Sequence, residues 1–183
     1  MKTKQNQMAT QSLPTKISWA KKAFERTTQF THDGQVVGEI KRDGIFGHDV
    51  TARLYNTHVR FDVMGFVVHS VNIHDLTNND KVVGRIELNF GKRATLTLKN
   101  GEVYVWKRAN FLMKEWHLIH DIPNTDNDPE VIDYERTRRL FFAEEGKINI
   151  LKPSPNEALL VLTGLFIRNY FLRRRRIAAG ATS

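Results

Sequence analysis

The amino-acid sequence predicts a mainly β protein, folded as a closed antiparallel barrel of about twelve strands around a central hydrophobic helix near the C-terminus. Three observations predict it. Short runs rich in Val, Ile, Thr, Tyr and Phe follow one another from residue 17 onward. Turn residues separate the runs, and no helical periodicity of useful length occurs before Ser154. A single apolar segment follows Ser154 and ends in four arginines.

The predicted strands are short and succeed one another without helical patterns between them, which favours an antiparallel sheet over βαβ units. Asp33-Gly34, Asn78-Asn79-Asp80 and Asn100-Gly101 are typical of hairpin turns, because Asn, Asp and Gly accept left-handed backbone angles. The predicted strands are 35–40, 50–55, 59–63, 66–73, 81–90, 94–98, 102–106, 111–119, 130–134, 139–142 and 148–151, with a further stretch around Trp19 and Phe24.

A weak internal repeat links two of these runs. The segment DGQVVGEI, residues 33–40, is echoed by NDKVVGRI, residues 79–86. Each has a turn followed by Val-Val-Gly-x-Ile, and a glycine inside a strand is typical of a bulge or a close backbone approach. The repeat therefore predicts equivalent hairpins in two parts of one sheet.

The segment after Ser154 is predicted to be a helix over about 155–173. Ser154 and Glu157 form a capping box, and Pro155 suits the first helical position. The apolar stretch 158–172 would span only about 22 Å, against about 30 Å for a hydrocarbon core, and Arg168 interrupts it. Because apolar residues point in every direction, we expect the helix to lie inside the barrel and Gly164 to mark a close approach of a strand.

The chain resembles the tubby C-terminal-like superfamily, which includes tubby proteins, plant LURP-one-related proteins and phospholipid scramblases, and within it small bacterial members of unassigned function. The resemblance rests on THDGQVVGEI, HDLTNNDKVVGRIEL, LKNGEVYVWKR and NEALLVLTGLFIRNY, and it covers residues 17–174 as an architecture. It implies a barrel of about twelve strands around a central helix, and no enzyme activity. Tubby proteins bind phosphoinositides through surface Lys and Arg, so the resemblance also implies an anionic partner.

The formal charge of +8 is concentrated in the first 26 residues and in the last arginines, so the body between them is close to neutral. We expect a flexible basic tail over 1–16, one domain over 17–176 and a flexible tail over 177–183. Basic ends favour anionic lipid or a membrane surface as the partner, whereas a protein-interaction module whose charge is incidental is the alternative. The residues predicted to contact an anionic ligand are Lys92, Arg93, Arg173, Arg174, Arg175 and Arg176.

Other basic pairs, Lys41-Arg42, Lys107-Arg108 and Arg138-Arg139, would join this surface only if they reach the same rim. The segment EVYVWKRANF mixes aromatic and basic residues as single-strand nucleic-acid binders do, but it matches no RNA-binding consensus. A nucleic-acid partner therefore ranks third, and Trp106 and Phe111 are predicted to pack in the core.

The sequence predicts no catalytic residue, no cofactor and no metal site. The chain has no cysteine and none of the usual catalytic motifs. His117 and His120 are three residues apart, which places them on opposite faces of a strand, so they are predicted not to share a metal. Asp126, Asp128 and Glu130 lack the turn glycine and the distant Glu of a calcium loop. We expect a binding protein that is cytoplasmic or peripheral at the membrane and has no transmembrane span.

Overall fold

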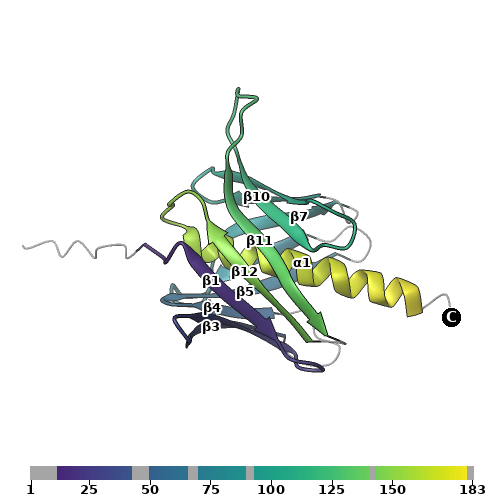
Figure 1. Cartoon of the computed structure of the whole chain (residues 1–183). Coiled ribbons are helices and arrows are strands. Elements are labelled where there is room, and N and C mark those ends of the chain that lie inside the picture. Colours follow the sequence, from purple (N-terminus) through teal and green to yellow (C-terminus); the bar gives the residue numbers. More distant parts are fainter. Residues whose placement is uncertain (1–11, 43–49, 66–69, 90–92, 141–142, 181–183) are drawn as a thin grey trace, which may run out of the picture.

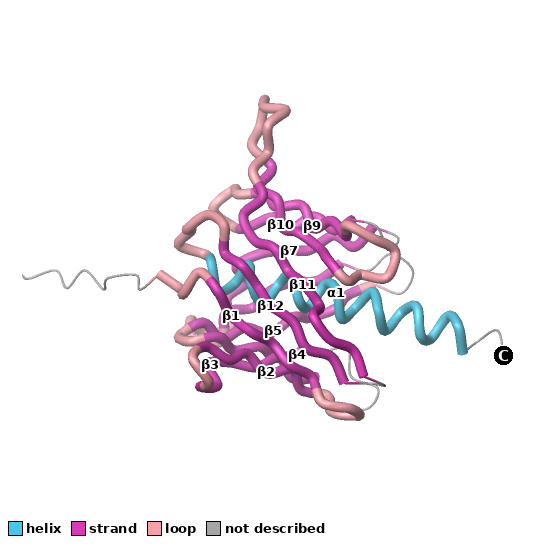
Figure 2. The backbone as a smooth tube through the Cα atoms, viewed as in Figure 1, coloured by secondary structure: helices cyan, strands magenta, loops and turns pink. Residues whose placement is uncertain are grey.

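The computed structural model describes residues 12–42, 50–65, 70–89, 93–140 and 143–180. Twelve antiparallel strands form a closed barrel, in which each strand pairs with its neighbours in sequence and the first pairs with the last. Figure 1 and Figure 2 show the helix running through the barrel. The strands are β1 Lys16–Lys21, β2 Thr27–His32, β3 Gln35–Arg42, β4 Val50–Leu54, β5 Thr57–Met64, β6 Ser70–Asp75, β7 Lys81–Asn89, β8 Arg93–Leu98, β9 Val103–Arg108, β10 Glu115–Asp121, β11 Glu130–Leu140 and β12 Ala143–Ile150, and the helix is α1 Glu157–Gly180.

The predicted fold class is confirmed, with local corrections to the strands. Phe24 lies in the loop between β1 and β2 with φ of 63°, and β2 is a strand of its own. The predicted strands 130–134 and 139–142 overlap one strand, β11, because a register shift between Arg136 and Arg138 absorbs the polar residues between them. The predicted strand 111–119 begins only at Glu115.

The two repeat glycines mark equivalent bulged hairpins, as the repeat predicts. The register shifts beside Gly38 in β3 and beside Gly84 in β7, which leaves Val37 and Val83 as the extra residues. The carbonyls of both valines accept a hydrogen bond of 2.9 Å from the residue that directly follows the next strand, which is Tyr55 after β4 and Lys99 after β8. β11 repeats this geometry at Val131, without the glycine. The barrel is therefore built from three equivalent four-stranded units, and β1 completes the third.

In each of the three units, an aromatic residue pairs across neighbouring strands with a smaller residue, and the pair occupies the equivalent position in every unit. The pairs are Phe61 with Val50, Trp106 with Ala94, and Trp19 with Gly146. Each aromatic residue meets α1. Phe61 stacks on Phe166 at 4.2 Å, Trp106 lies 5.4 Å from Phe171, and Arg168 lies over Trp19 at 5.1 Å. The helix thus fills the barrel by contacting all three units.

The helix begins with the predicted capping contacts. The Ser154 N–H donates to the Glu157 carboxylate at 3.0 Å, and the Asn156 N–H donates to Ser154 Oγ at 3.1 Å. The other Glu157 oxygen accepts a hydrogen bond from Leu13 N–H, which fixes the chain before β1 to the helix start. All ten residues from Leu159 to Arg168 are buried, as expected for a helix surrounded by protein on every side.

Gly164 lies against Tyr134 of β11. A Cβ at this position would overlap the Tyr134 phenol group, so the predicted close approach is confirmed and its partner is a side chain. The Tyr134 O–H donates to the Leu160 carbonyl at 2.9 Å, and Trp106 Nε1–H donates to the Gly164 carbonyl at 3.1 Å. Burial raises the pKa of Tyr134 well above its ordinary value, so the phenol remains a donor.

The predicted end of the helix at 173 is too early. α1 continues to Gly180, because the arginines and Ala178-Ala179 are good helix formers and no helix breaker precedes Gly180. The four arginines therefore lie within the helix, and residues 177–180 are helical where a flexible tail was expected. From Leu172 to Gly180 the helix extends about 12 Å at 1.5 Å per residue, and Figure 1 shows it projecting beyond the barrel.

Candidate functional site: a basic cavity at the distal end

The barrel has two unlike ends. We call the end at which α1 begins the proximal end, and the end from which α1 leaves the distal end. A cavity of about 330 Å³ opens at the distal end, between α1 and the ends of the surrounding strands. Its lining combines basic and apolar side chains: Lys21, Phe24, Glu25, Arg26, Thr28, Ile40, Arg42, Val50, Val63, Glu144, Phe166, Asn169, Tyr170, Leu172, Arg173 and Arg176.

Strand alternation positions two of the cations. Lys21 is the last residue of β1 and continues the inward-facing row of the buried residues Ile17 and Trp19. Arg42 is the last residue of β3 and continues the inward-facing row of Gly38 and Ile40 in the same way. Both side chains therefore face the barrel axis at its distal mouth, where the helix supplies Arg173 and Arg176.

These cations repel one another in a partly desolvated space. Burial lowers the pKa of Lys21, and the charges of Arg176 and Arg42 lower it further, although Glu144 opposes the shift. Burial also lowers the pKa of Arg173, with Arg42 as the next cause. The Nε–H groups of Arg42 and Arg173 are buried and have no hydrogen-bond partner among the described residues. Such groups are costly unless a partner reaches them.

The two acids of the cavity offset the charge of this group only in part. Glu25 lies 3.8 Å from Lys22 in an exposed ion pair. Glu144 is held by three arginines outside the group, at 2.9 Å from Arg168, 3.7 Å from Arg136 and 3.9 Å from Arg139. Among the described residues, no ion pair is recorded for Lys21, Arg42, Arg173 or Arg176.

Arg168 anchors the floor beneath this end of the barrel. Its side chain is fully buried, donates to Glu144 at 2.9 Å, and lies over the rings of Trp19 and Trp116 at 5.1 and 4.7 Å. Burial alone would raise the pKa of Glu144, but Arg168, Arg136 and Arg139 outweigh it and hold that pKa below its ordinary value of 4.5. Arg168 is therefore a structural cation, unlike the arginines that follow it.

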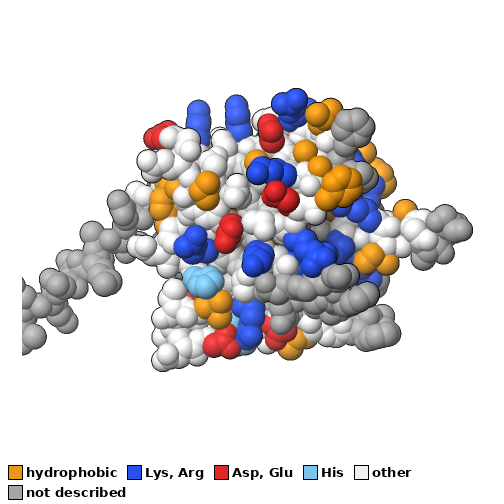
Figure 3. All heavy atoms as spheres, turned by 90° about the horizontal axis from the view of Figure 1, so that it is seen from below, with side chains coloured by type: hydrophobic (Ala, Val, Ile, Leu, Met, Phe, Trp, Pro, Cys, Tyr) orange, Lys and Arg blue, Asp and Glu red, His pale blue; other side chains and the backbone are white. Residues whose placement is uncertain are grey.

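Exposed apolar side chains surround the distal cations. Phe24 is 85% exposed in the β1–β2 loop, Leu112 is 64% exposed in the β9–β10 loop, and Ile177 is 64% exposed on the projecting helix. Figure 3 shows Lys and Arg side chains next to hydrophobic ones toward the end from which the helix emerges. Trp106 is buried as predicted, but the prediction that Phe111 belongs to the core is wrong.

Phe111 packs against two arginines at the surface instead of entering the core. Arg175 lies over the ring at 4.2 Å and donates to the Phe111 carbonyl at 2.9 Å, and Arg108 lies over the ring at 5.5 Å. The contact ties the projecting helix to the β9–β10 loop.

The predicted ligand contacts separate into three groups. Arg173 and Arg176 line the cavity, whereas Arg174 is exposed and Arg175 holds Phe111. Arg93 is exposed at the start of β8, opposite Lys107, and does not line the cavity. Lys92 lies outside the described residues. The sequence prediction missed Lys21 and placed Arg42 only among unassigned pairs. Their spacing of two from buried apolar residues is the signal that could have found them.

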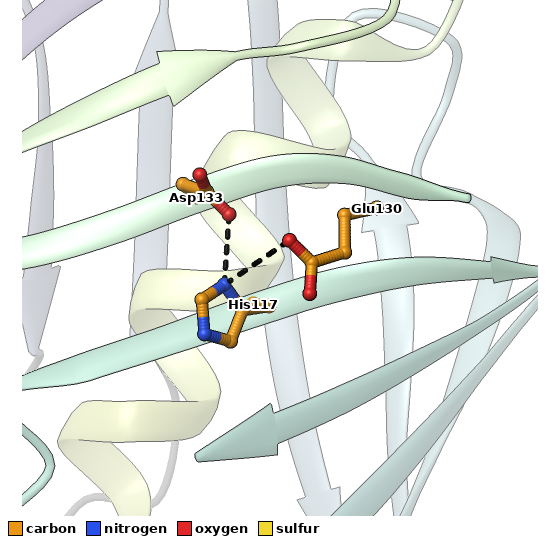
Figure 4. A group of neighbouring side chains, drawn as sticks. All are labelled: His117, Glu130 and Asp133. Carbon is orange, nitrogen blue, oxygen red and sulfur yellow. Dashed lines mark hydrogen bonds and ion pairs between the residues drawn. The ribbon is translucent and has the colours of Figure 1, made fainter. Parts of the chain in front are cut away.

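A second group of ionisable side chains lies on the outer wall of the barrel. His117 Nδ1 lies 2.7 Å from Asp133 and 3.7 Å from Glu130, and Figure 4 shows the three side chains converging from neighbouring strands. The bulge at Val131 brings Glu130 and Asp133 to one face despite their spacing of three. Their ligand atoms lie within 4.8 Å of one another, so they are the one set in the described part of the chain with metal-binding geometry.

His120 takes no part in that group. It stacks on the Tyr104 ring at 4.7 Å, on the opposite side of β10 from His117, as the sequence predicts. Asp128 accepts a hydrogen bond from Ile122 N–H and so closes its own loop.

No family model, no curated protein and no solved structure matches this chain. Within the described residues, no helix combines the length and the apolar character that a membrane crossing requires.

Proposed function

We propose that this protein is a non-enzymatic binding module that docks its distal end on an anionic membrane surface. The observation that carries the proposal is that cations with no ion pair among the described residues and exposed apolar side chains lie together at one end of the barrel. Peripheral membrane proteins combine these two features, because Lys and Arg attract anionic head groups while apolar side chains enter the interface.

The opposite end supports a defined orientation. The described turns of the proximal end carry more acidic than basic residues, which are Asp33, Asp80, Glu102, Asp126 and Asp128 against Lys99 and Lys152. An anionic surface therefore repels these described proximal turns while it attracts the distal end. Docked in this way, the helix axis points toward the membrane and the projecting turns of α1 enter the head-group layer.

The anionic cytoplasmic leaflet is the membrane surface that suits this charge distribution. The resemblance to the tubby-like superfamily agrees with the proposal, and kinship with that superfamily stays a prediction.

The test is sedimentation with vesicles of defined composition. We expect the protein to sediment with vesicles containing phosphatidylserine and to remain in the supernatant with phosphatidylcholine alone. Raising salt from about 0.05 M to about 0.5 M should release it, since the Debye length falls several-fold. Absence of binding to phosphatidylserine vesicles at low salt would refute the proposal and favour a protein-interaction module.

A second arm tests the apolar contribution. Replacing Phe24 with Ser removes a side chain that is 85% exposed, so stability should change by at most about 0.5 kcal/mol. Vesicle binding should weaken even at low salt, because the apolar contact with the interface is lost. Unchanged binding would show that the attraction is electrostatic alone.

A further inference from the structure

We infer that the distal cavity binds one phosphate group that carries a short apolar chain. The inference rests on the proposed function in one respect: it assumes that the distal end is where anionic ligands arrive. It goes further by assigning a defined site and a ligand class to the cavity, whereas docking on a membrane surface requires only a basic, apolar face.

The cation arrangement indicates a multiply charged anion. Lys21, Arg42, Arg173 and Arg176 come from β1, β3 and α1 and line one cavity. The pKa values of Lys21 and Arg173 are lowered by burial and by neighbouring cations, so an anion that enters relieves repulsion already present in the protein. A phosphate monoester carries up to two charges and matches the planar fork of arginine.

Two of the donors are already desolvated. The Nε–H groups of Arg42 and Arg173 are buried and lack a hydrogen-bond partner among the described residues. A phosphate oxygen that accepts from them gains hydrogen bonds without the usual cost of removing water from the donors.

The remaining wall is apolar. Ile40, Val50, Val63, Phe166 and Leu172 line the same cavity, and Ile40, Val50 and Phe166 are buried. At about 330 Å³, the cavity lies at the lower end of the size range of ligand pockets. This space suits a phosphate together with a chain of a few methylene groups, and it leaves a longer chain to emerge at the mouth.

Octyl phosphate is a suitable probe because it is monomeric at low concentration and needs no membrane. In calorimetric titrations we expect it to bind on the order of 10- to 100-fold more tightly than inorganic phosphate, from burial of a few methylene groups. Octyl glucoside has the same chain without the charge, and octanoate has one charge at most, so both should bind at least about tenfold more weakly than octyl phosphate. Equal affinity for octyl phosphate and either comparator would overturn the assignment of a phosphate.

Charge-matched variants locate the site. Arg42→Gln with Arg173→Gln should reduce octyl phosphate affinity at least about tenfold. Lys114→Gln with Arg138→Gln removes the same charge from exposed distal residues that do not line the cavity, and it should leave that affinity within about twofold. Equal losses in both double variants would overturn the cavity as the site.

Val63→Phe tests the apolar wall by filling it. It should weaken octyl phosphate binding and leave binding of inorganic phosphate unchanged, and the opposite result would contradict the placement of the chain. If octyl phosphate does not bind while phosphatidylserine vesicles do, the cavity inference fails and the membrane proposal stands. If octyl phosphate binds and vesicles do not, the membrane proposal fails while the ligand class stands.

Discussion

The proximal and distal ends of this barrel differ in whether their polar groups have hydrogen-bond partners. At the proximal end, two carboxylates each accept two hydrogen bonds: Glu157 accepts from Ser154 and Leu13, and Glu102 accepts from Tyr104 and Asn156. At the distal end, Arg42 and Arg173 keep buried donors without partners among the described residues, and Phe24 is exposed. Satisfied groups stabilise a fold, whereas unsatisfied groups at one place indicate a site that something else completes.

Arg168 lies near the distal end, but it is buried and paired with Glu144. Among the single variants, we expect its replacement to lower the free energy of unfolding most. Arg168→Met would leave Glu144 buried with weaker partners, which should cost about 3–5 kcal/mol of unfolding free energy. Urea unfolding followed by tryptophan fluorescence measures it. The exposed Arg174→Gln is the control, with an expected change below about 0.5 kcal/mol. Similar values for the two variants would contradict a structural role for Arg168 that the exposed Arg174 does not share.

Gly164→Ala tests the packing of the helix against the barrel wall. Alanine stabilises an exposed helix by about 1 kcal/mol relative to glycine. Here the added Cβ would overlap Tyr134, so we expect a loss of about 1–3 kcal/mol instead. A gain in the thermal midpoint would mean that the helix does not contact β11 as described.

Glu157→Gln separates stability from binding. Removing the charge weakens the hydrogen bonds from the Ser154 N–H at the helix start and from the Leu13 N–H before β1, and should cost about 0.5–2 kcal/mol. Vesicle binding should not change, because the residue is at the proximal end. Arg174→Gln should weaken vesicle binding and leave stability unchanged. If either variant changed stability and vesicle binding to a similar extent, the two ends would not have separate roles.

Part of the loss of stability at acid pH should come from protonation of Glu144. Its pKa is held below 4.5 by three arginines, so its contribution is present above that pH and is lost as the pH falls through the lowered pKa. Glu144→Gln should therefore be less stable at pH 7, and its stability should decline less between pH 4.5 and pH 2. Parallel pH profiles of the two proteins would contradict the assignment.

Residue patterns that depend on local geometry predicted the fold well. Period-two alternation, turn pairs and a helix apolar on all sides were enough for a closed barrel around a helix, and the paired Val-Val-Gly segments located two bulges. The third bulge, at Val131, has no glycine and therefore left no sequence signal. β2 was missed because its residues, TTQFTH, are mostly polar.

The site was harder to predict because it depends on closure of the barrel. Lys21 and Arg42 are 21 residues apart in sequence, and only the pairing of β1, β2 and β3 brings them to one mouth. The run of four arginines looked uniform, yet a helix turns successive residues through about 100°, so the four have different neighbours. Phe111 was assigned to the core because a sequence does not show that arginines cover its ring.

The most direct test of the account compares two variants of equal charge by sedimentation with phosphatidylserine vesicles at low salt. One replaces Arg173, Arg174, Arg175 and Arg176 with Gln at the distal end. The other replaces Lys81, Arg85, Lys99 and Lys152 with Gln, and these four residues are exposed and lie away from that end. At about 1 kcal/mol per charge, the distal variant should lose on the order of 100- to 1,000-fold in affinity, while the control stays close to the unaltered protein. Equal losses would show that net charge alone drives binding and would contradict a distal docking face.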